Sequence, residues 1–206
     1  MASAKRLVEQ NALMAEGGWR DQLSVLPMLS GERLGIMGLG AIGSRVARVG
    51  LAFGMEVVAW SPRMTPERAA AENVKAVSLD ELLSTSKIIS MHLVAGPGTK
   101  GLISADQMSR MRPDSILVNT SRSALINMQD LQAALALGCP NQAAIDVFDI
   151  EPLPTQDALR KMPNLLATPH LGFIAEPIFK IFSEGITKTL SAWLDNQPVS
   201  HPFKPT

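Results

Sequence analysis

A glycine-rich turn between an expected strand and an expected helix constrains the fold of this chain more than any other feature. Gly38-Leu39-Gly40-Ala41-Ile42-Gly43 follows a short apolar run at 33–37 and opens the segment 41–53. In that segment apolar residues recur at three- and four-residue spacing, which predicts a helix with one buried face, formed by Ile42, Val46, Val49 and Phe53. Gly54 ends the helix, and 56–60 is typical of a second buried strand.

Each glycine of this turn has a physical reason to be there. Gly38 permits the tight turn, Gly40 lets a diphosphate approach the backbone, and Gly43 lets the helix pack closely on the strand. The unpaired N–H groups at the start of the helix, with Ala41 and Ile42 as its first residues, carry partial positive charge toward phosphates. The strand–turn–helix context therefore favours a dinucleotide site, and glycines that serve turn geometry alone are the alternative.

Strands and helices alternate along the rest of the chain. Buried strands are expected at 88–93, 115–119, 143–147 and 164–167. Helices are expected to begin at three capping patterns: Thr65-Pro66-Glu67, Ser78 to Glu81, and Ser104 to Gln107. Two further helices are expected over Asn127 to Gly138 and over 177–194. This alternation predicts an α/β fold of the Rossmann type, a doubly wound parallel sheet with helices on both faces.

Three parts are expected along the chain. Residues 1–29 form a linking or dimerisation helix, over about 4–16, and a loop; residues 30–175 form the dinucleotide-binding domain; residues 176–206 form a final helix and tail. One face of the final helix is apolar and, left exposed, would favour self-association: Phe179, Phe182, Ile186, Leu190, Trp193 and Leu194.

Composition excludes several classes of protein. The 206 residues are 46% hydrophobic, which is too apolar for a disordered chain. Nineteen basic and nineteen acidic residues cancel, so we expect no nucleic acid and no anionic membrane as partner. A single cysteine excludes an internal disulfide framework and a thiolate-rich zinc site, and no metal is expected. No apolar run is long enough to span a bilayer, so a cytoplasmic protein is expected.

The end of the second strand bears on the choice of dinucleotide. An acidic residue at this place binds the ribose hydroxyls of NAD, whereas here the place is taken by Ser61, followed by Arg63. Without a carboxylate a 2′-phosphate is not repelled, and Arg63 can pair with it. The sequence therefore predicts NAD or NADP and slightly favours NADP, with a solvated surface arginine as the alternative for Arg63.

Three later segments carry a family resemblance. Asn119-Thr120-Ser121-Arg122, the run from Ile145 to Leu153, and Thr168-Pro169-His170-Leu171-Gly172 resemble signatures of the D-isomer-specific 2-hydroxyacid dehydrogenases, in the right order after the glycine turn. The resemblance implies hydride transfer between a nicotinamide cofactor and a small 2-keto or 2-hydroxy acid. It also implies a homodimer that pairs through the cofactor domain.

The resemblance implies a role for each site residue. Arg122 would hold the substrate carboxylate and carbonyl, His170 would be the acid/base, and Glu151 would orient His170. Asp146 would contact the nicotinamide carboxamide, and the other expected cofactor contacts are Leu93, Val94, Thr120, Ser121 and Gly172. These residue types suit the chemistry, because an imidazole can donate a proton near neutral pH and a guanidinium matches a carboxylate.

Structural roles are the alternatives for these residues. His170 could cap a strand, Arg122 could be a surface cation, Glu151 a solvated loop acid, and Asp146 a turn cap. For three further residues, His92, Cys139 and His201, we expect a structural or inert role.

Two departures from the family pattern affect the expected activity. Ser123 and Ala124 stand where the family usually has glycine and proline. A side chain at 123 would crowd the cofactor or substrate, or would force a backbone change if the position needed a positive φ. Family members also carry about a hundred residues, most of a substrate domain, before the segment matching this start. We therefore expect cofactor binding with impaired turnover for this chain alone. The alternatives are a non-catalytic NAD(H)-sensing interaction module of the same fold, and a subunit completed by a separate chain.

Overall fold

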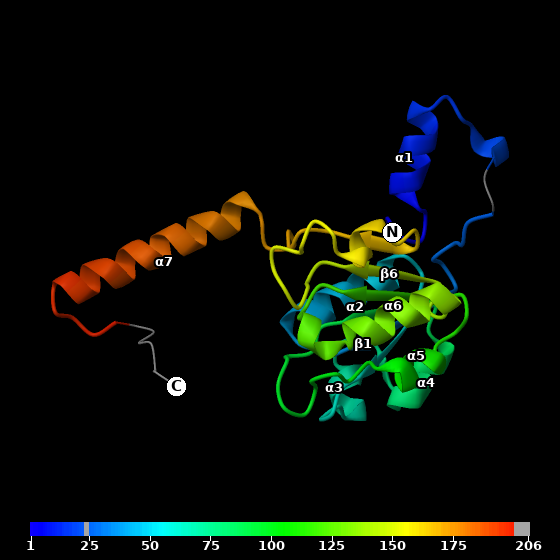
Figure 1. Ribbon diagram of the computed structural model, residues 1–206. Helices are drawn as coiled ribbons and strands as arrows, with labels where there is room; N and C mark the ends of the chain where they lie inside the picture. The colour runs from blue at the N-terminus through cyan, green and yellow to red at the C-terminus, as the bar shows by residue number, and fades with distance from the viewer. Residues whose placement is uncertain (23–24, 200–206) are drawn as a thin grey trace. The chain divides into compact units, whose positions relative to one another are not determined.

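The computed structural model of the protein describes residues 1–22 and 25–199 (Figure 1). The chain divides into two compact units, Met1–Pro169 and His170–Thr206, which are described separately below. His201 lies outside the described residues.

The first unit is built on one parallel sheet of seven strands. In chain order the strands are β1 (Arg33–Met37), β2 (Glu56–Trp60), β3 (Lys75–Ala76), β4 (Ile88–Met91), β5 (Ile116–Asn119), β6 (Gln142–Ile145) and β7 (Leu165–Ala167). Their spatial order is β3-β2-β1-β4-β5-β6-β7, and every adjacent pair is parallel. The predicted doubly wound sheet is confirmed, with its topological switch between β1 and β4. The two-residue strand β3 was not predicted.

The helices follow the predicted starts closely. They are α1 (Leu7–Ala15), α2 (Ala41–Ala52), α3 (Pro66–Ala70), α4 (Leu79–Thr85), α5 (Ala105–Ser109), α6 (Met128–Leu137) and α7 (Glu176–Leu194), with short 3₁₀ turns at Arg20–Gln22, Ser123–Leu125 and Ala158–Lys161. Thr65, Ser78 and Asn127 each accept a backbone N–H at the start of a helix. Gly138 ends α6 in the left-handed region. These caps satisfy backbone groups that a helix end leaves open.

The sheet separates two apolar cores. On one face Leu34, Ile36, Val57 and Ala59 pack with Ala47 of α2 and Ala69 of α3. On the other face Met37, Ile89, Met91 and Leu117 pack with side chains of α4, α5 and α6. Both faces are therefore covered by helices, as the sequence predicted, and the carboxyl ends of the strands share one edge.

The predicted buried face of α2 is wrong except at Val46, which is half-buried and packs against the core. Ile42, Val49 and Phe53 are 66%, 54% and 44% exposed, and the buried residues of α2 are instead Gly43, Ser44, Ala47 and Gly50. Small residues face the sheet because the helix lies too close to the strands for larger ones: a Cβ on Gly50 would lie 2.5 Å from Leu34 Cδ2. Because the helix lies this close to the sheet, its small residues face the strands, and Ile42, Val49 and Phe53 face solvent.

The two terminal helices carry apolar residues without burying them. Neither α1 nor α7 has a buried residue, although Ala4, just before α1, is buried. The apolar face predicted for α7 is exposed throughout: Phe179, Phe182, Ile186, Leu190, Trp193 and Leu194.

Candidate functional site

The glycine turn joins β1 to α2 and leaves no room for a side chain at its first and last glycines, Gly38 and Gly43. Gly38 has φ +100°, its N–H donates to the Trp60 carbonyl at 2.8 Å, and a Cβ on it would lie 2.8 Å from the His92 carbonyl group. A Cβ on Gly43 would lie 2.0 Å from the Gly38 oxygen. Since heavy atoms cannot approach that closely, both positions require glycine for packing alone.

Gly40 differs from its two neighbours because its side-chain position faces open space. Its backbone is extended (φ −101°, ψ −161°), and a Cβ built there meets no atom within 4 Å. Gly40 is the N-cap of α2, and no side chain caps the helix. Packing does not explain this glycine, whereas a diphosphate lying against the start of α2 would explain it. The turn therefore fits a dinucleotide.

A cavity of about 230 Å³ opens beside this turn. Its lining brings together six of the predicted cofactor residues: Gly38, Gly40, Ser61, Arg63, Leu93 and Val94. Five others line it as well: Leu39, Pro62, Arg68, His92 and Thr99. Arg68 was missed, although the cap at Thr65 already placed it in the first turn of a helix that follows β2. Three of the other predicted contacts, Ala41, Ile42 and Thr120, are exposed and directly follow β1 or β5 or their adjoining turns.

His92 links the cavity to the core of the sheet. Its ring Nε2 lies 2.9 Å from the Ser90 hydroxyl, and its backbone N–H donates to the Met37 carbonyl. Burial lowers the pKa of the imidazole. Burial thus favours the neutral imidazole over the charged one. A neutral, hydrogen-bonded histidine agrees with the structural role expected for it.

The loop after β5 is fixed to the loop after β4. Asn119 is fully buried: its Oδ1 accepts the Ser121 N–H at 3.0 Å, and its Nδ2 donates to the Arg122 carbonyl at 2.9 Å. The Ser121 hydroxyl donates to the Leu93 carbonyl at 2.8 Å. These bonds hold Arg122 at the carboxyl edge, where its guanidinium is exposed and has no carboxylate partner within the described part of the first unit.

The predicted strain at Ser123 is absent. Ser123 begins a 3₁₀ turn, and it is not among the non-glycine residues with positive φ in the described chain. The backbone of the turn after Arg122 therefore does not require a glycine at position 123.

Two acidic residues lie after β6, at the same edge. Asp146 is 4% exposed and its Oδ1 accepts the Thr168 hydroxyl at 2.5 Å. Glu151 Oε1 accepts the Phe148 N–H at 2.8 Å. A hydrogen bond within the protein thus orients each carboxylate, whereas a freely solvated surface acid has no such constraint.

The predicted acid/base lies at the start of the second unit. His170 has φ +51°, a region that non-glycine residues rarely adopt, and its ring meets Phe173 edge-on at 5.5 Å between centroids. Gly172 follows in the same unit. Strained backbone of this kind is common at functional residues and motivates a hypothesis of function.

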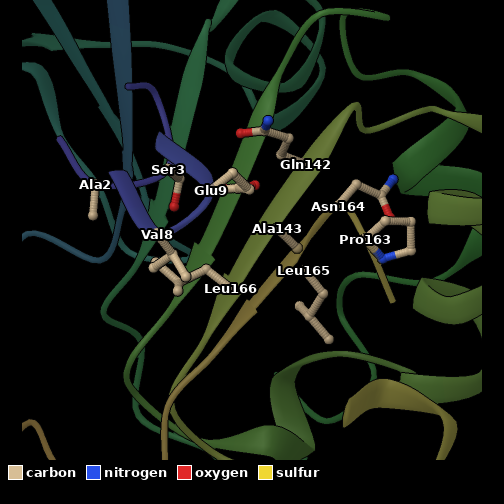
Figure 2. A pocket seen from close by; sticks show the side chains of 10 residues that line it. All are labelled: Ala2, Ser3, Val8, Glu9, Gln142, Ala143, Pro163, Asn164, Leu165 and Leu166. Atoms are coloured by element: carbon tan, nitrogen blue, oxygen red, sulfur yellow. The ribbon is translucent and has the colours of Figure 1, made fainter. Parts of the chain in front are cut away.

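A second cavity, of about 190 Å³, lies at the other edge of the sheet (Figure 2). It is bounded by residues near the N-terminus and by the first residues of β6 and β7: Ala2, Ser3, Val8, Glu9, Gln142, Ala143, Pro163, Asn164, Leu165 and Leu166. Ligands of open α/β sheets bind outside the carboxyl ends of the strands, so this cavity is at the wrong edge for a dinucleotide.

Two features are absent from the described residues, 1–22 and 25–199. No three His, Cys, Asp or Glu side chains there are grouped as metal ligands. No helix within those ranges combines the length and apolarity needed to cross a membrane.

The turn, the open position at Gly40 and the topology define a dinucleotide-binding α/β unit of the Rossmann type. Residues 1–172 match the family model of the D-isomer specific 2-hydroxyacid dehydrogenase, NAD binding domain, and the chain belongs to this family. The family resemblance predicted from three short segments is confirmed, and a nicotinamide cofactor is indicated.

Characterised relatives are similar over most of this chain. It is 33% identical over 197 residues to a glyoxylate reductase of Korarchaeum cryptofilum, covering 94% of this chain and 59% of that protein. It is 35% identical over 176 residues to a D-3-phosphoglycerate dehydrogenase of Synechocystis, covering 85% of this chain and 32% of that protein. The crystal structure of a phosphoglycerate oxidoreductase from Vibrio cholerae superposes with a TM-score of 0.84 at 32% identity, covering 93% of this chain and 63% of that one. The chain thus spans less than two thirds of each of these proteins.

The contrast between Gly40 and Gly43 gives a matched test of the turn. We predict that Gly40→Val raises the dissociation constants of NADH and NADPH about tenfold or more, because its side chain fills the space left for the diphosphate. The melting temperature should stay near that of the wild type. In Gly43→Ala the melting temperature should fall, because the added Cβ meets the Gly38 oxygen. Fluorescence titration measures the affinities, and thermal unfolding measures the melting temperatures. Unchanged affinity for NADH and NADPH in Gly40→Val would contradict diphosphate binding at this turn.

Proposed function

We propose that this chain is the cofactor-binding part of an NAD(P)-dependent 2-hydroxyacid dehydrogenase, which interconverts a small 2-keto acid and its 2-hydroxy acid. The observation that carries the proposal is Gly40, a glycine at the N-cap of α2 whose side-chain position is open. Family membership supports the reaction class. The glyoxylate reductase among the relatives makes glyoxylate and hydroxypyruvate the first substrates to assay.

The cofactor would lie along the carboxyl edge of the sheet. Gly38, Gly40 and Gly43, with the amides of Ala41 and Ile42, would hold the diphosphate. Leu93, Val94, Thr120 and Ser121 would border the nicotinamide half, and Asp146 and Gly172 would complete that end. When bound, the nicotinamide supplies or accepts the hydride.

Three side chains would act on the substrate. Arg122 would bind the carboxylate, since its planar guanidinium is exposed at this edge and pairs with no acid in the described first unit. His170 would donate a proton to the carbonyl oxygen as negative charge develops on it. Glu151 would orient His170, the role that the family resemblance implies for it.

NADP is the slightly favoured cofactor. Ser61 replaces the acid that would repel a 2′-phosphate, and it lines the cavity together with Arg63. No carboxylate is among the residues that line this cavity. These observations support NADP over NAD.

Replacing the proposed acid tests the reaction. We predict that NAD(P)H-dependent reduction of glyoxylate or hydroxypyruvate falls about 10²-fold or more in His170→Ala, the usual size of a general-acid effect. NADH affinity should stay within about twofold, because the diphosphate site is untouched. Retained turnover in His170→Ala would contradict the role of His170. A wild-type chain that binds NADH without turnover, and captures a protein partner only with NADH present, would favour the sensing module.

We also propose a cytoplasmic homodimer that pairs through the first unit. The exposed apolar row of α2, Ile42, Val49 and Phe53, supports this arrangement, because such a row is costly to leave in water. α1 also carries exposed apolar residues: Leu7, Val8 and Met14. The single cysteine is consistent with a reducing compartment.

A charge on this row tests the dimer. We predict that Val49→Asp weakens self-association about tenfold or more, since the carboxylate would be buried against the partner copy. Leu137→Asp is the matched control, because Leu137 is exposed at the end of α6 on the other face of the sheet. Sedimentation equilibrium gives both constants. Equal association of the two variants would place the interface away from α2.

A further inference from the structure

Arg68 lines the cavity beside the glycine turn and is held there by the turn itself. Its Nη2 donates to the Leu39 carbonyl at 3.1 Å, and Leu39 lies between the first two glycines of the motif. The guanidinium of Arg68 therefore belongs to the cofactor cavity, although its backbone belongs to α3, which follows β2.

Local structure fixes the backbone of Arg68. Thr65 caps α3 by accepting the Arg68 N–H at 3.3 Å, and Pro66 starts the helix. The next residue, Ala69, is fully buried in the core beneath α2 and α3. Arg68 is thus anchored at its amide, at the neighbouring buried residue and at its guanidinium. Arg63, by contrast, has no side-chain hydrogen bond or ion pair within the described chain.

The cations at the two edges of the sheet differ in whether they pair with carboxylates. At the amino edge the cations are neutralised: Arg33 pairs with Glu56 at 2.8 Å, and Lys87 pairs with Asp114 at 2.8 Å. At the carboxyl edge Arg63 and Arg68 pair with no carboxylate in the described residues of the first unit, and no acid lines their cavity. Two guanidinium groups and the Ser61 hydroxyl around one cavity suit a phosphate, which accepts several charge-assisted hydrogen bonds.

We infer that Arg68 is the main specificity-determining residue for NADP, and that it binds the 2′-phosphate with a larger contribution than Arg63. The inference rests on the proposed function, which supplies the dinucleotide. Arg68 contributes more because its guanidinium is already ordered by Leu39, whereas Arg63 must be ordered on binding. A guanidinium has five N–H donors, so four remain for the phosphate after the bond to Leu39.

Affinities of NADPH and NADH in four proteins test this inference. In Arg68→Ala we expect the dissociation constant of NADPH to rise about tenfold or more, the value of one charge-assisted hydrogen bond, while that of NADH changes less than about threefold. Arg63→Ala should raise the NADPH constant by less than Arg68→Ala does. Arg110→Ala is the control, because it removes an equal charge from exposed ion pairs with Asp80 of α4 and Asp106 of α5.

Two probes without nicotinamide separate this inference from the proposed function. We expect 2′,5′-ADP to bind more tightly than 5′-AMP to the wild type, and Arg68→Ala to remove that difference. Binding of 2′,5′-ADP that depends on Arg68, without binding of NADPH, would support the phosphate site and overturn the proposed dehydrogenase.

Three results would overturn the inference. The first is an equal loss of NADPH and NADH affinity in Arg68→Ala, which would give Arg68 a purely structural role in holding the turn. The second is a larger loss in Arg63→Ala than in Arg68→Ala. The third is equal binding of 2′,5′-ADP and 5′-AMP by the wild-type protein.

Discussion

The contact between Gly43 and the carbonyl of Gly38 determines how the rest of the site is arranged. With no side chain between them, the start of α2 lies directly on the end of β1. The first amides of α2 are then delivered to the carboxyl edge of the sheet without a capping side chain. Gly38 also donates to Trp60, which ties the turn to the end of β2, where Ser61 and the arginines follow. One close backbone contact thus positions both the proposed diphosphate site and the cationic cavity beside it.

The electrostatics of the sheet edges follow the same division. At the amino edge both partners of each ion pair belong to this chain. Hydrogen bonds from Arg112 and Lys87 there hold the pKa of the Asp114 carboxyl well below its usual range. Those cations are already compensated and stabilise the fold. At the carboxyl edge Arg122 has no carboxylate partner within the described first unit, and the cavity beyond it has none in its lining. An anionic ligand would supply the missing compensation there, which is why the proposed cofactor and substrate both belong at that edge.

Local signals predicted most of the fold. The hydroxyls of Thr65 and Ser78 and the amide of Asn127 marked helix starts to the residue, because capping depends on neighbours in sequence. The face of α2 could not be predicted in this way. Its apolar row has helical spacing, yet distance to the sheet selected the small residues instead. Strand β3 was missed because two residues give no periodic signal.

Site residues that lie within or next to a sequence motif were predicted. A residue that reaches the site only through the tertiary structure was missed. Ser61 and Arg63 adjoin β2 in sequence, whereas Arg68 reaches the glycine turn across α3 through its bond to Leu39. The roles of Arg122, Glu151 and His170 came from a resemblance, and they remain predictions.

Amide chemical shifts of the ¹⁵N-labelled chain during an NADPH titration show whether the cofactor lies on the glycine turn, because they report each backbone position separately. We predict large, saturable shifts for Ala41, Ile42 and Gly43 at the start of α2, together with Ser61. Shifts confined to the cavity between the N-terminal residues and the first residues of β6 and β7, with the glycine turn unmoved, would contradict it.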